Sequence, residues 1–397
     1  MAAAIELVRN DSDPVAIAER MRPLLRANSV RTEKERRLAP ENVAALEEAG
    51  LFKVMVPKRW GGFGASIDSY VRTAAALARG CPATGWVQSI TNISAWIGSH
   101  LPDRGQEEIF AGQSPRICSV LSPTATTRRV AGGYFIERAR WGFASGCLHS
   151  NWAGVGIPLV DEDGKMLEHG IAYIPMDELE IEDDWFVAGM RGTGSNTLTA
   201  SNVTVPDHRV LSFTQGLNGV WPAQHHNGEV SDRYAVMPVL AIDLVGPIIG
   251  VAEAALEAVA NGASERGITY TTYARQSDSS VVHRNLGEAA LRIDAARLHA
   301  LRAAADIDAG ASADRQMDFS TRARVRADAA WTGKLLRDSI DQLASIAGAG
   351  AFADSHPVQR LWRDANVASR HAALAIGACL EIYGRALLGV DNITAMI

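Results

Sequence analysis

The sequence predicts an α+β protein built in three parts, and three changes of pattern along the chain indicate it. Residues 1–115 carry apolar residues at helical spacing, residues 116–215 form short alternating segments split by Gly, Pro and Asp, and residues 216–397 return to helix. Four long amphipathic segments in the last part are apolar enough to bury one another. We therefore expect an N-terminal helical domain, a middle antiparallel β domain and a C-terminal four-helix bundle.

Apolar spacing and end signals predict the individual elements. N-terminal helices are expected over 13–38, 40–52, 68–80 and 84–102, with Pro40 opening the second and Gly80 ending the third. The bundle helices are expected over 241–267, 283–310, 319–348 and 358–389. In the β domain, DEDGK at 161–165 predicts a hairpin turn.

Composition excludes several classes of function. The chain has 397 residues, of which 47% are hydrophobic and 21% charged, and its net charge is -6. Nucleic acid is excluded as the main partner because it requires a basic stripe. No secretory signal is apparent, and no stretch reaches the roughly 18 apolar residues of a membrane span. The four cysteines lack CxxC spacing and are expected to be free thiols, so we expect a cytoplasmic protein without a membrane.

The segment WGFASG after the strand-like GGYFIERAR is the first candidate site. Alternation places Trp141, Phe143 and Ser145 on one face, where the aromatics could cover a flat ring and the serine could bond its edge. The alternative is a sheet whose aromatic face covers the helical core.

A helix stripe is the second candidate. Asn92, Trp96 and His100 follow at i, i+4 and i+8, and Gln88 extends the stripe. It could line a polar pocket for an aromatic ligand, or it could be a partly exposed helix side. His100 could also simply cap the helix C-terminus.

Two histidines near the C-terminus form the third candidate. His356 precedes a proline and is expected at a helix entrance, whereas His371 is expected on the same side of that helix as Asp364. A helix histidine is a candidate general base near neutral pH, although a lone histidine is more often structural.

Several motifs are absent. RGTGSN at 191–196 and AGAGAF at 347–352 are not dinucleotide fingerprints, although both could allow a close approach. His225 and His226 are adjacent, which is poor geometry for a shared metal, and we predict no metal site. A GxSxG nucleophile elbow is missing as well.

The quoted motifs resemble the acyl-CoA dehydrogenase superfold over roughly residues 15–390. LSPTATTRRVAGGYFIERARWGFASG is similar to its flavin-contacting β segment, AGMRGTGSNTLTASNVTVPDHRVL to the segment that closes that domain, and AGAGAFADSHPVQRLWRDANVASRH to its last helices. The resemblance implies that these last helices carry flavin contacts for a neighbouring subunit. Dehydrogenases carry a Glu base in the run that matches RDANVASRHAAL, but Ala372 stands there.

Within this superfold, W-x-F-x-S-G at Ser145 and H-P-x-Q-R at 356–360 resemble the two-component flavin-dependent monooxygenases that hydroxylate phenols, indoles and polyketide-type rings. This resemblance implies that a separate NAD(P)H flavin reductase supplies reduced flavin, FADH2 or FMNH2, with O2 as co-substrate. A shielded flavin C4a-hydroperoxide would then hydroxylate a small aromatic substrate. It also implies a homotetramer, a dimer of dimers.

The resemblance implies roles for particular residues. His371 and Ser145 are the expected catalytic residues. The substrate is expected at Asn92, Trp96, His100, Ser122 and His371. The flavin is expected at Leu121, Ser122, Trp141, Phe143, Ala144, Ser145, Arg266, Gly348 and Gly350. The R-x-x-F-G run of the dehydrogenases is missing around Arg266, which leaves FAD or FMN open.

Three alternatives remain at this point. An acyl-CoA dehydrogenase-like enzyme would need a relocated carboxylate, for instance Asp243 or Glu253. An amino-sugar N-oxygenase of the same fold should show a roomy polar pocket open to the loop 216–232. A non-catalytic member of the fold should not hold flavin.

Overall fold

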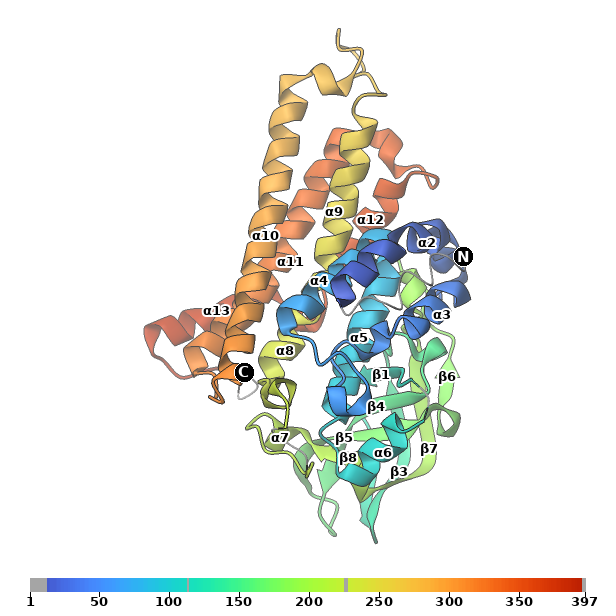
Figure 1. Cartoon of the computed structure of the whole chain (residues 1–397), viewed down its shortest axis with the longest axis vertical. Helices are drawn as coiled ribbons and strands as arrows, with labels where there is room; N and C mark the ends of the chain where they lie inside the picture. Colours follow the sequence, from blue (N-terminus) through green and yellow to red (C-terminus); the bar gives the residue numbers. More distant parts are fainter. Residues whose placement is uncertain (1–12, 113, 225–227, 395–397) are drawn as a thin grey trace.

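The computed structural model describes residues 13–112, 114–224 and 228–394. The adjacent pair His225 and His226 lies outside these ranges. Figure 1 shows the long C-terminal helices at one end of the molecule, the strands at the other, and the N-terminal helices between them. The three expected parts are therefore layers that meet in the middle of the molecule.

Helices make up the described N-terminal part up to Phe110, as predicted. Their bounds are α2 (Pro14–Glu35), α3 (Pro40–Glu48), α4 (Ile67–Gly80), α5 (Pro82–Gly98) and α6 (Asp103–Phe110). Asp13 caps α2 by accepting the N–H of Val15 at 2.9 Å, with proline at the first helical position. Helix α5 is buried along nearly its whole length, so it is the central helix on which the other layers pack.

Two four-stranded sheets form the β part, in the orders β1-β4-β5-β8 and β2-β3-β7-β6. The strands are β1 (Ile117–Val120), β2 (Thr126–Val130), β3 (Gly133–Trp141), β4 (Trp152–Val160), β5 (Met166–Pro175), β6 (Glu180–Glu182), β7 (Thr197–Pro206) and β8 (Val210–Ser212). The β4–β5 hairpin is confirmed, with Gly164 at φ 80° in its turn. The prediction of a purely antiparallel domain is wrong for one pair, because β1 runs parallel to β4 and is joined to it through β2 and β3.

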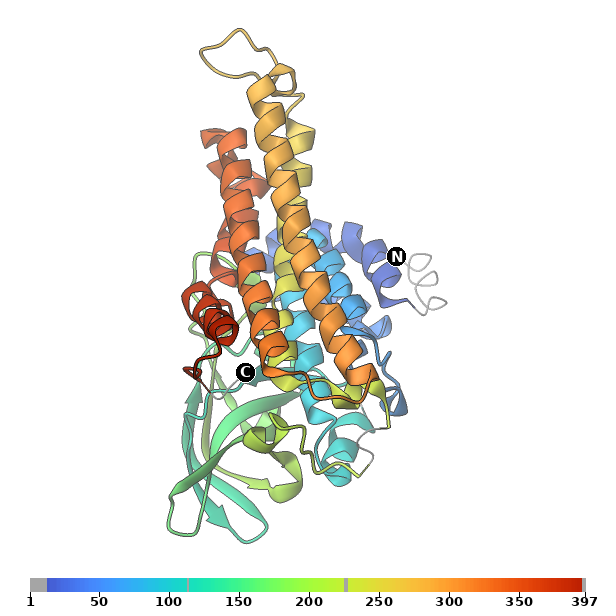
Figure 2. The ribbon, with the colours of Figure 1, turned by 90° about the vertical axis from the view of Figure 1, so that its left-hand side faces the viewer.

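The last part contains α7 (Phe213–Gly216), α8 (Val236–Ile242), α9 (Val245–Gly262), α10 (Ser280–Ser312), α11 (Phe319–Ala347), α12 (Pro357–Ala368) and α13 (Ile376–Leu388). The prediction of one unbroken fourth bundle helix is wrong. Helix α12 ends at Ala368, and the chain turns before α13, as Figure 2 shows. His371 lies in this break because its Nδ1 accepts the N–H of Ala373 at 3.2 Å and starts a new turn.

One apolar stretch is longer than predicted, since no stretch was expected to reach the length of a membrane span. Val236–Gly262 has a mean hydropathy of 2.0 over its most apolar window, which would suffice to cross a membrane by length and composition. In the fold, 83% of that window is buried. Its apolar character is therefore accounted for by packing against α4 and α11 in the core.

A tight seam joins the β part to the bundle. The buried carboxylate Oδ1 of Asp364 on α12 accepts the backbone N–H of Met190 at 2.5 Å. Next to it, the backbone of Gly189 lies so close to α12 that a Cβ there would be 2.2 Å from the carbonyl oxygen of Arg363. Arg363 also donates to the carbonyl oxygen of Ala188 at 2.6 Å. Burial raises the pKa of Asp364 to about 7.

Gly189→Ala should destabilise the protein by about 1–3 kcal/mol, because the added methyl group meets backbone that cannot move aside independently. Gly287→Ala on α10 is the matched control. A Cβ there meets nothing within 4 Å, so alanine should stabilise the helix by about 0.5–1 kcal/mol. Urea unfolding of the three proteins measures both effects. Equal stability of the two variants would contradict the close approach.

Asp364→Asn should flatten the dependence of stability on pH. The folded carboxyl, with a pKa of about 7 against 3.8 as its ordinary value, holds its proton more tightly than the unfolded one. Its contribution is therefore fully present below about pH 4 and is lost as pH rises through about 7. Asparagine keeps an oxygen for the Met190 N–H but cannot ionise. Between about pH 5 and pH 8 the wild-type protein should lose about 3 kcal/mol of unfolding free energy more than the variant.

Candidate active site

The chain leaves β3 abruptly at the WGFASG segment. Trp141 faces the interior between the sheets, where its Nε1 donates to the carbonyl oxygen of Gly156 at 2.9 Å. Phe143 instead adopts a left-handed φ of 68° and is 74% exposed. The prediction that Trp141, Phe143 and Ser145 share one strand face is therefore wrong. Strand pairing stops at Trp141, after which nothing imposes alternation.

Ser145 lies at the centre of a buried cluster of polar groups. Its Oγ accepts the indole N–H of Trp86 from α5 at 3.1 Å and lies 2.8 Å from the hydroxyl of Ser195. Ser195 lies 2.6 Å from the hydroxyl of Thr193, which donates to the carbonyl oxygen of Met190 at 2.8 Å. The RGTGSN motif is thus a close-approach loop that brings two hydroxyls to Ser145.

The structure brings His371 to the other side of Trp86. The two rings meet edge to face, with centroids 6.1 Å apart. His371 is exposed, yet the surrounding protein lowers the pKa of its imidazole below the usual value. The predicted catalytic pair, Ser145 and His371, is therefore joined by Trp86.

Sequence reasoning missed Trp86, Ser195 and Thr193. Trp86 lies on the helix that carries the predicted polar stripe, but on another side of it, so the stripe did not include it. Ser195 and Thr193 belong to a motif that periodicity shows only as a loop. A second aromatic side chain, Trp185, packs edge to face on Phe143 with centroids 5.6 Å apart.

The predicted polar stripe on α5 exists, but its side chains form hydrogen bonds with other parts of the protein. Asn92 accepts the N–H of Met55 and donates to the carbonyl oxygen of Leu51, and Trp96 donates to the carbonyl oxygen of Ser231. Nδ1 of His100 bonds the carbonyl oxygen of Trp96 at 2.9 Å in the last turn of α5. This is the capping interpretation of His100. All three predicted stripe residues are at most 1% exposed, so a substrate reaches them only if the surrounding structure moves.

Leu121 and Ser122 lie in the turn after β1. The backbone of Leu121 passes close over Gly156, whose carbonyl oxygen accepts from Trp141. The carbonyl oxygen of Leu121 also accepts from Nε2 of His169 at 2.6 Å. Ser122 is exposed. These residues therefore lie across β4 from Trp141, on the rim of the β part.

The remaining flavin candidates lie elsewhere. A guanidinium nitrogen of Arg266 is 2.6 Å from Nε2 of His356, which caps α12 as predicted. Gly348 and Gly350 precede that helix, and a Cβ at either would meet nothing within 4 Å. Figures 1 and 2 show the α9–α10 and α11–α12 connections at the end of the bundle away from the sheets. One chain therefore does not bring Arg266 to Ser145.

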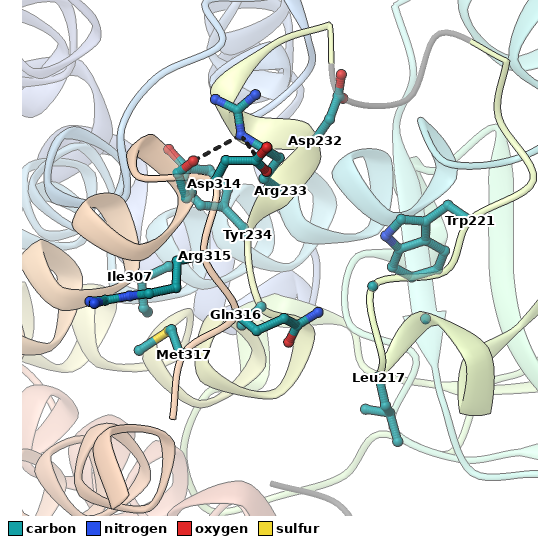
Figure 3. Close-up of a pocket in the computed structure, with 14 residues that line it drawn as sticks. Leu217, Trp221, Asp232, Arg233, Tyr234, Ile307, Asp314, Arg315, Gln316 and Met317 are labelled. Atoms are coloured by element: carbon teal, nitrogen blue, oxygen red, sulfur yellow. Dashed lines mark hydrogen bonds and ion pairs between the residues drawn. The ribbon is translucent and has the colours of Figure 1, made fainter. Parts of the chain in front are cut away.

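A separate cavity of about 240 Å³ lies between residues 216–221, residues 232–235 and the turn that joins α10 to α11. Figure 3 shows Trp221, Tyr234 and Met317 around it, with Arg233 bonded to the carbonyl oxygen of Ala311 and paired with Asp314. Neither Trp86, Ser145 nor His371 lines this cavity. It meets the α5 stripe through Trp221, whose ring centroid is 4.4 Å from that of His100, and through Tyr234, whose ring centroid is 6.3 Å from that of Trp96.

The two candidates for a relocated base differ in burial, because Asp243 is buried and Glu253 is half-buried. Asp243 is 4% exposed, and burial raises the pKa of its carboxyl well above the usual value. Burial also raises the pKa of Glu253, which lies 3.6 Å from the guanidinium of Arg79. Over residues 13–112, 114–224 and 228–394, no group of three or more His, Cys, Asp or Glu side chains could hold a metal ion. All four cysteines are buried free thiols.

Comparisons with known proteins place the chain in a family. The acyl-CoA dehydrogenase N-terminal domain matches residues 16–118, and the acyl-CoA dehydrogenase C-terminal domain matches residues 242–375. The oxygenase subunit HsaA, a flavin-dependent monooxygenase of Mycobacterium tuberculosis, is 33% identical over 98% of both chains. The oxygenase component of an FADH2-dependent resorcinol hydroxylase from a Rhizobium species is 28% identical over 93% of this chain and 92% of its own.

Solved structures agree with the sequence relatives. XiaF from a Streptomyces species, determined in complex with FADH2 and glycerol, superposes with a TM-score of 0.92 and 31% identity over 100% of this chain and 99% of its own. The HsaA monooxygenase of M. tuberculosis superposes with a TM-score of 0.91 and 32% identity over 98% of this chain and 100% of its own. The chain therefore belongs to the oxygenase subunits of flavin-dependent monooxygenases with the acyl-CoA dehydrogenase fold, which confirms the predicted fold and the predicted enzyme class.

Proposed function

We propose that this protein hydroxylates a small phenol-like or indole-like aromatic molecule with reduced flavin that a separate NAD(P)H-dependent reductase supplies. The observation that carries this proposal is the meeting of Ser145 and His371 on either side of Trp86. A flavin edge at Ser145 and a substrate at His371 would then both lie next to the side chain of Trp86. Reduced flavin, when bound, supplies the activation of O2.

The loop at Ser145 fits a flat ring. Phe143 holds a left-handed backbone, which costs a non-glycine residue free energy, and presents most of its ring to solvent. Trp185 supports that ring from the side. A bound isoalloxazine would cover this exposed aromatic surface. The roles of Trp141 and Ala144, both buried, are then to support the loop rather than to touch the ring.

His371 fits the role of a substrate anchor that donates a hydrogen bond. Its lowered pKa keeps the imidazole neutral at pH 7. Its Nδ1 accepts the N–H of Ala373, so the single ring proton is assigned to Nε2. An Nε2–H donor stabilises a phenolate oxygen, and a phenolate is more electron-rich than a phenol at the carbon to be hydroxylated.

The far end of the bundle fits a flavin phosphate. Nε2 of His356 lies 2.6 Å from a guanidinium nitrogen of Arg266, which can only donate, so His356 holds the guanidinium in place as its acceptor. The other N–H groups of Arg266 could donate to a phosphate oxygen. Gly348 and Gly350 leave open space beside them. Because this end lies away from Ser145, we propose that a second copy supplies it, within a homotetramer.

The alternatives fit less well. Ala372 offers no base, Asp243 is buried and Glu253 is half-buried beside Arg79, which disfavours an acyl-CoA dehydrogenase. A polar cavity does border the segment 216–235, as an amino-sugar N-oxygenase would need. It lacks both Ser145 and His371, so we do not adopt that function. The buried thiols agree with a reducing cytoplasm as the location.

The proposed function predicts a measurable delay in flavin reoxidation. The purified protein is loaded anaerobically with reduced FAD or reduced FMN and mixed rapidly with oxygenated buffer, with a panel of phenols and indoles present in parallel. Slow return of oxidised-flavin absorbance, with hydroxylated product in place of peroxide for some panel member, is the expected result. The preferred flavin would appear from the same traces. Immediate reoxidation with stoichiometric peroxide for both flavins would contradict the proposal.

His371→Ala should lower the product formed per reduced flavin by about 10- to 100-fold. This is the effect of losing one hydrogen bond to a charged oxygen. His371→Gln keeps a donor and should retain more product than His371→Ala. His283→Ala, which removes an exposed histidine on α10, is the matched control and should behave as wild type. Equal yields for all three variants would rule out the anchor role.

A further inference from the structure

The hydrogen-bond chain behind Ser145 has a defined direction. It runs from Trp86 through Ser145 and Ser195 to Thr193 and ends on the carbonyl oxygen of Met190. An indole N–H can only donate and a carbonyl oxygen can only accept, so both ends of the chain are set. Each of the three hydroxyls between them has one proton.

Counting protons gives the direction of every bond. Thr193 donates to the carbonyl oxygen of Met190, so it can only accept from Ser195. Ser195 has then used its proton, so it can only accept from Ser145. Thr193 is 1% exposed and Ser195 4% exposed, so neither finds water as an alternative partner, and an unused donor there would cost free energy. In this arrangement all four donors are paired.

We propose that Thr193 and Ser195 are positioning residues that hold the Ser145 hydroxyl as a hydrogen-bond acceptor and so make the site select reduced over oxidised flavin. The proposal rests on the proposed function and adds that the flavin edge facing Ser145 is the one that carries N5. The Ser145 oxygen uses one of its two lone pairs to accept from Trp86, which leaves the second for a ligand. Reduced flavin carries a proton on N5 and donates to that lone pair, whereas oxidised N5 is itself an acceptor.

Oxidised flavin can accept from Ser145 only if one bond of the chain is given up. If Ser145 donates to N5, either it no longer donates to Ser195, or the whole chain reverses and the bond from Thr193 to Met190 is lost. In both cases one buried hydrogen bond is lost, which is worth about 0.5–1.5 kcal/mol. The expected preference for reduced flavin from this source is about two- to tenfold, since 1.4 kcal/mol corresponds to a factor of ten.

The test measures dissociation constants of oxidised and of reduced flavin, not turnover. Ser195→Ala frees the Ser145 proton, and Thr193→Val removes the acceptor that holds Ser195. Both should lower the ratio of the oxidised to the reduced dissociation constant by about two- to tenfold, which moves the midpoint potential of bound flavin about 10–30 mV more negative. Ser195→Thr keeps the hydroxyl and should restore the wild-type ratio. Circular dichroism confirms that each variant is folded.

Ser150→Ala is the matched control. Its hydroxyl bonds the carbonyl oxygen of Gly146 in the same loop but takes no part in the chain, so the ratio should not change. Wild-type ratios in both Ser195→Ala and Thr193→Val, together with a changed ratio in Ser145→Ala, would overturn the inference and leave the proposed function standing. Failure of the wild-type protein to bind either flavin would overturn both.

Discussion

The seam between Met190 and α12 is the contact on which the candidate site depends. A single backbone N–H donates there to the buried Asp364, and the missing side chain of Gly189 lets α12 lie against the loop. The loop continues through Thr193 and Ser195 to Ser145, and α12 ends three residues before His371. This one contact therefore sets the positions of both Ser145 and His371 relative to Trp86. The carboxyl is buried at a cost, which its raised pKa expresses.

Burial of small hydroxyls explains how the site can have a fixed direction of hydrogen bonding without a charged residue. Ser145, Ser195 and Thr193 are neutral, and water has little access to them. In such surroundings a hydrogen bond is strong and an unpaired donor is costly, so the direction of the chain is determined by its two ends. Exposed serines would exchange partners with water and lose this property. The position of Trp86, at one end of this chain and against His371, makes it the structural link between Ser145, where we propose the flavin, and His371, where we propose the substrate.

The two regions proposed to bind flavin lie far apart in one chain, and this is the reason for proposing a homotetramer. Arg266 and His356 face each other at the end of the bundle, and Phe143 exposes its ring beside the β part. Each region has a feature that suits a ligand: a guanidinium held by a histidine in one, and uncovered aromatic surface in the other. A flavin that served both would have to span two copies of the chain. The buried, apolar α9 contributes to the core rather than to such an interface.

The sequence by itself determined the layers of this protein and the chemistry available to it. Periodicity located nearly every helix, and the replacement of a carboxylate by Ala372 separated the chain from the dehydrogenases, as the relatives confirm. Only the tertiary structure decided which residues meet. Phe143 leaves the expected face because pairing ends at Trp141, and His371 leaves the expected helix because it caps a new turn. Trp86, Ser195 and Thr193 became visible only through contacts between segments far apart in the chain, and a periodic pattern records which side of an element is buried, not what it is buried against.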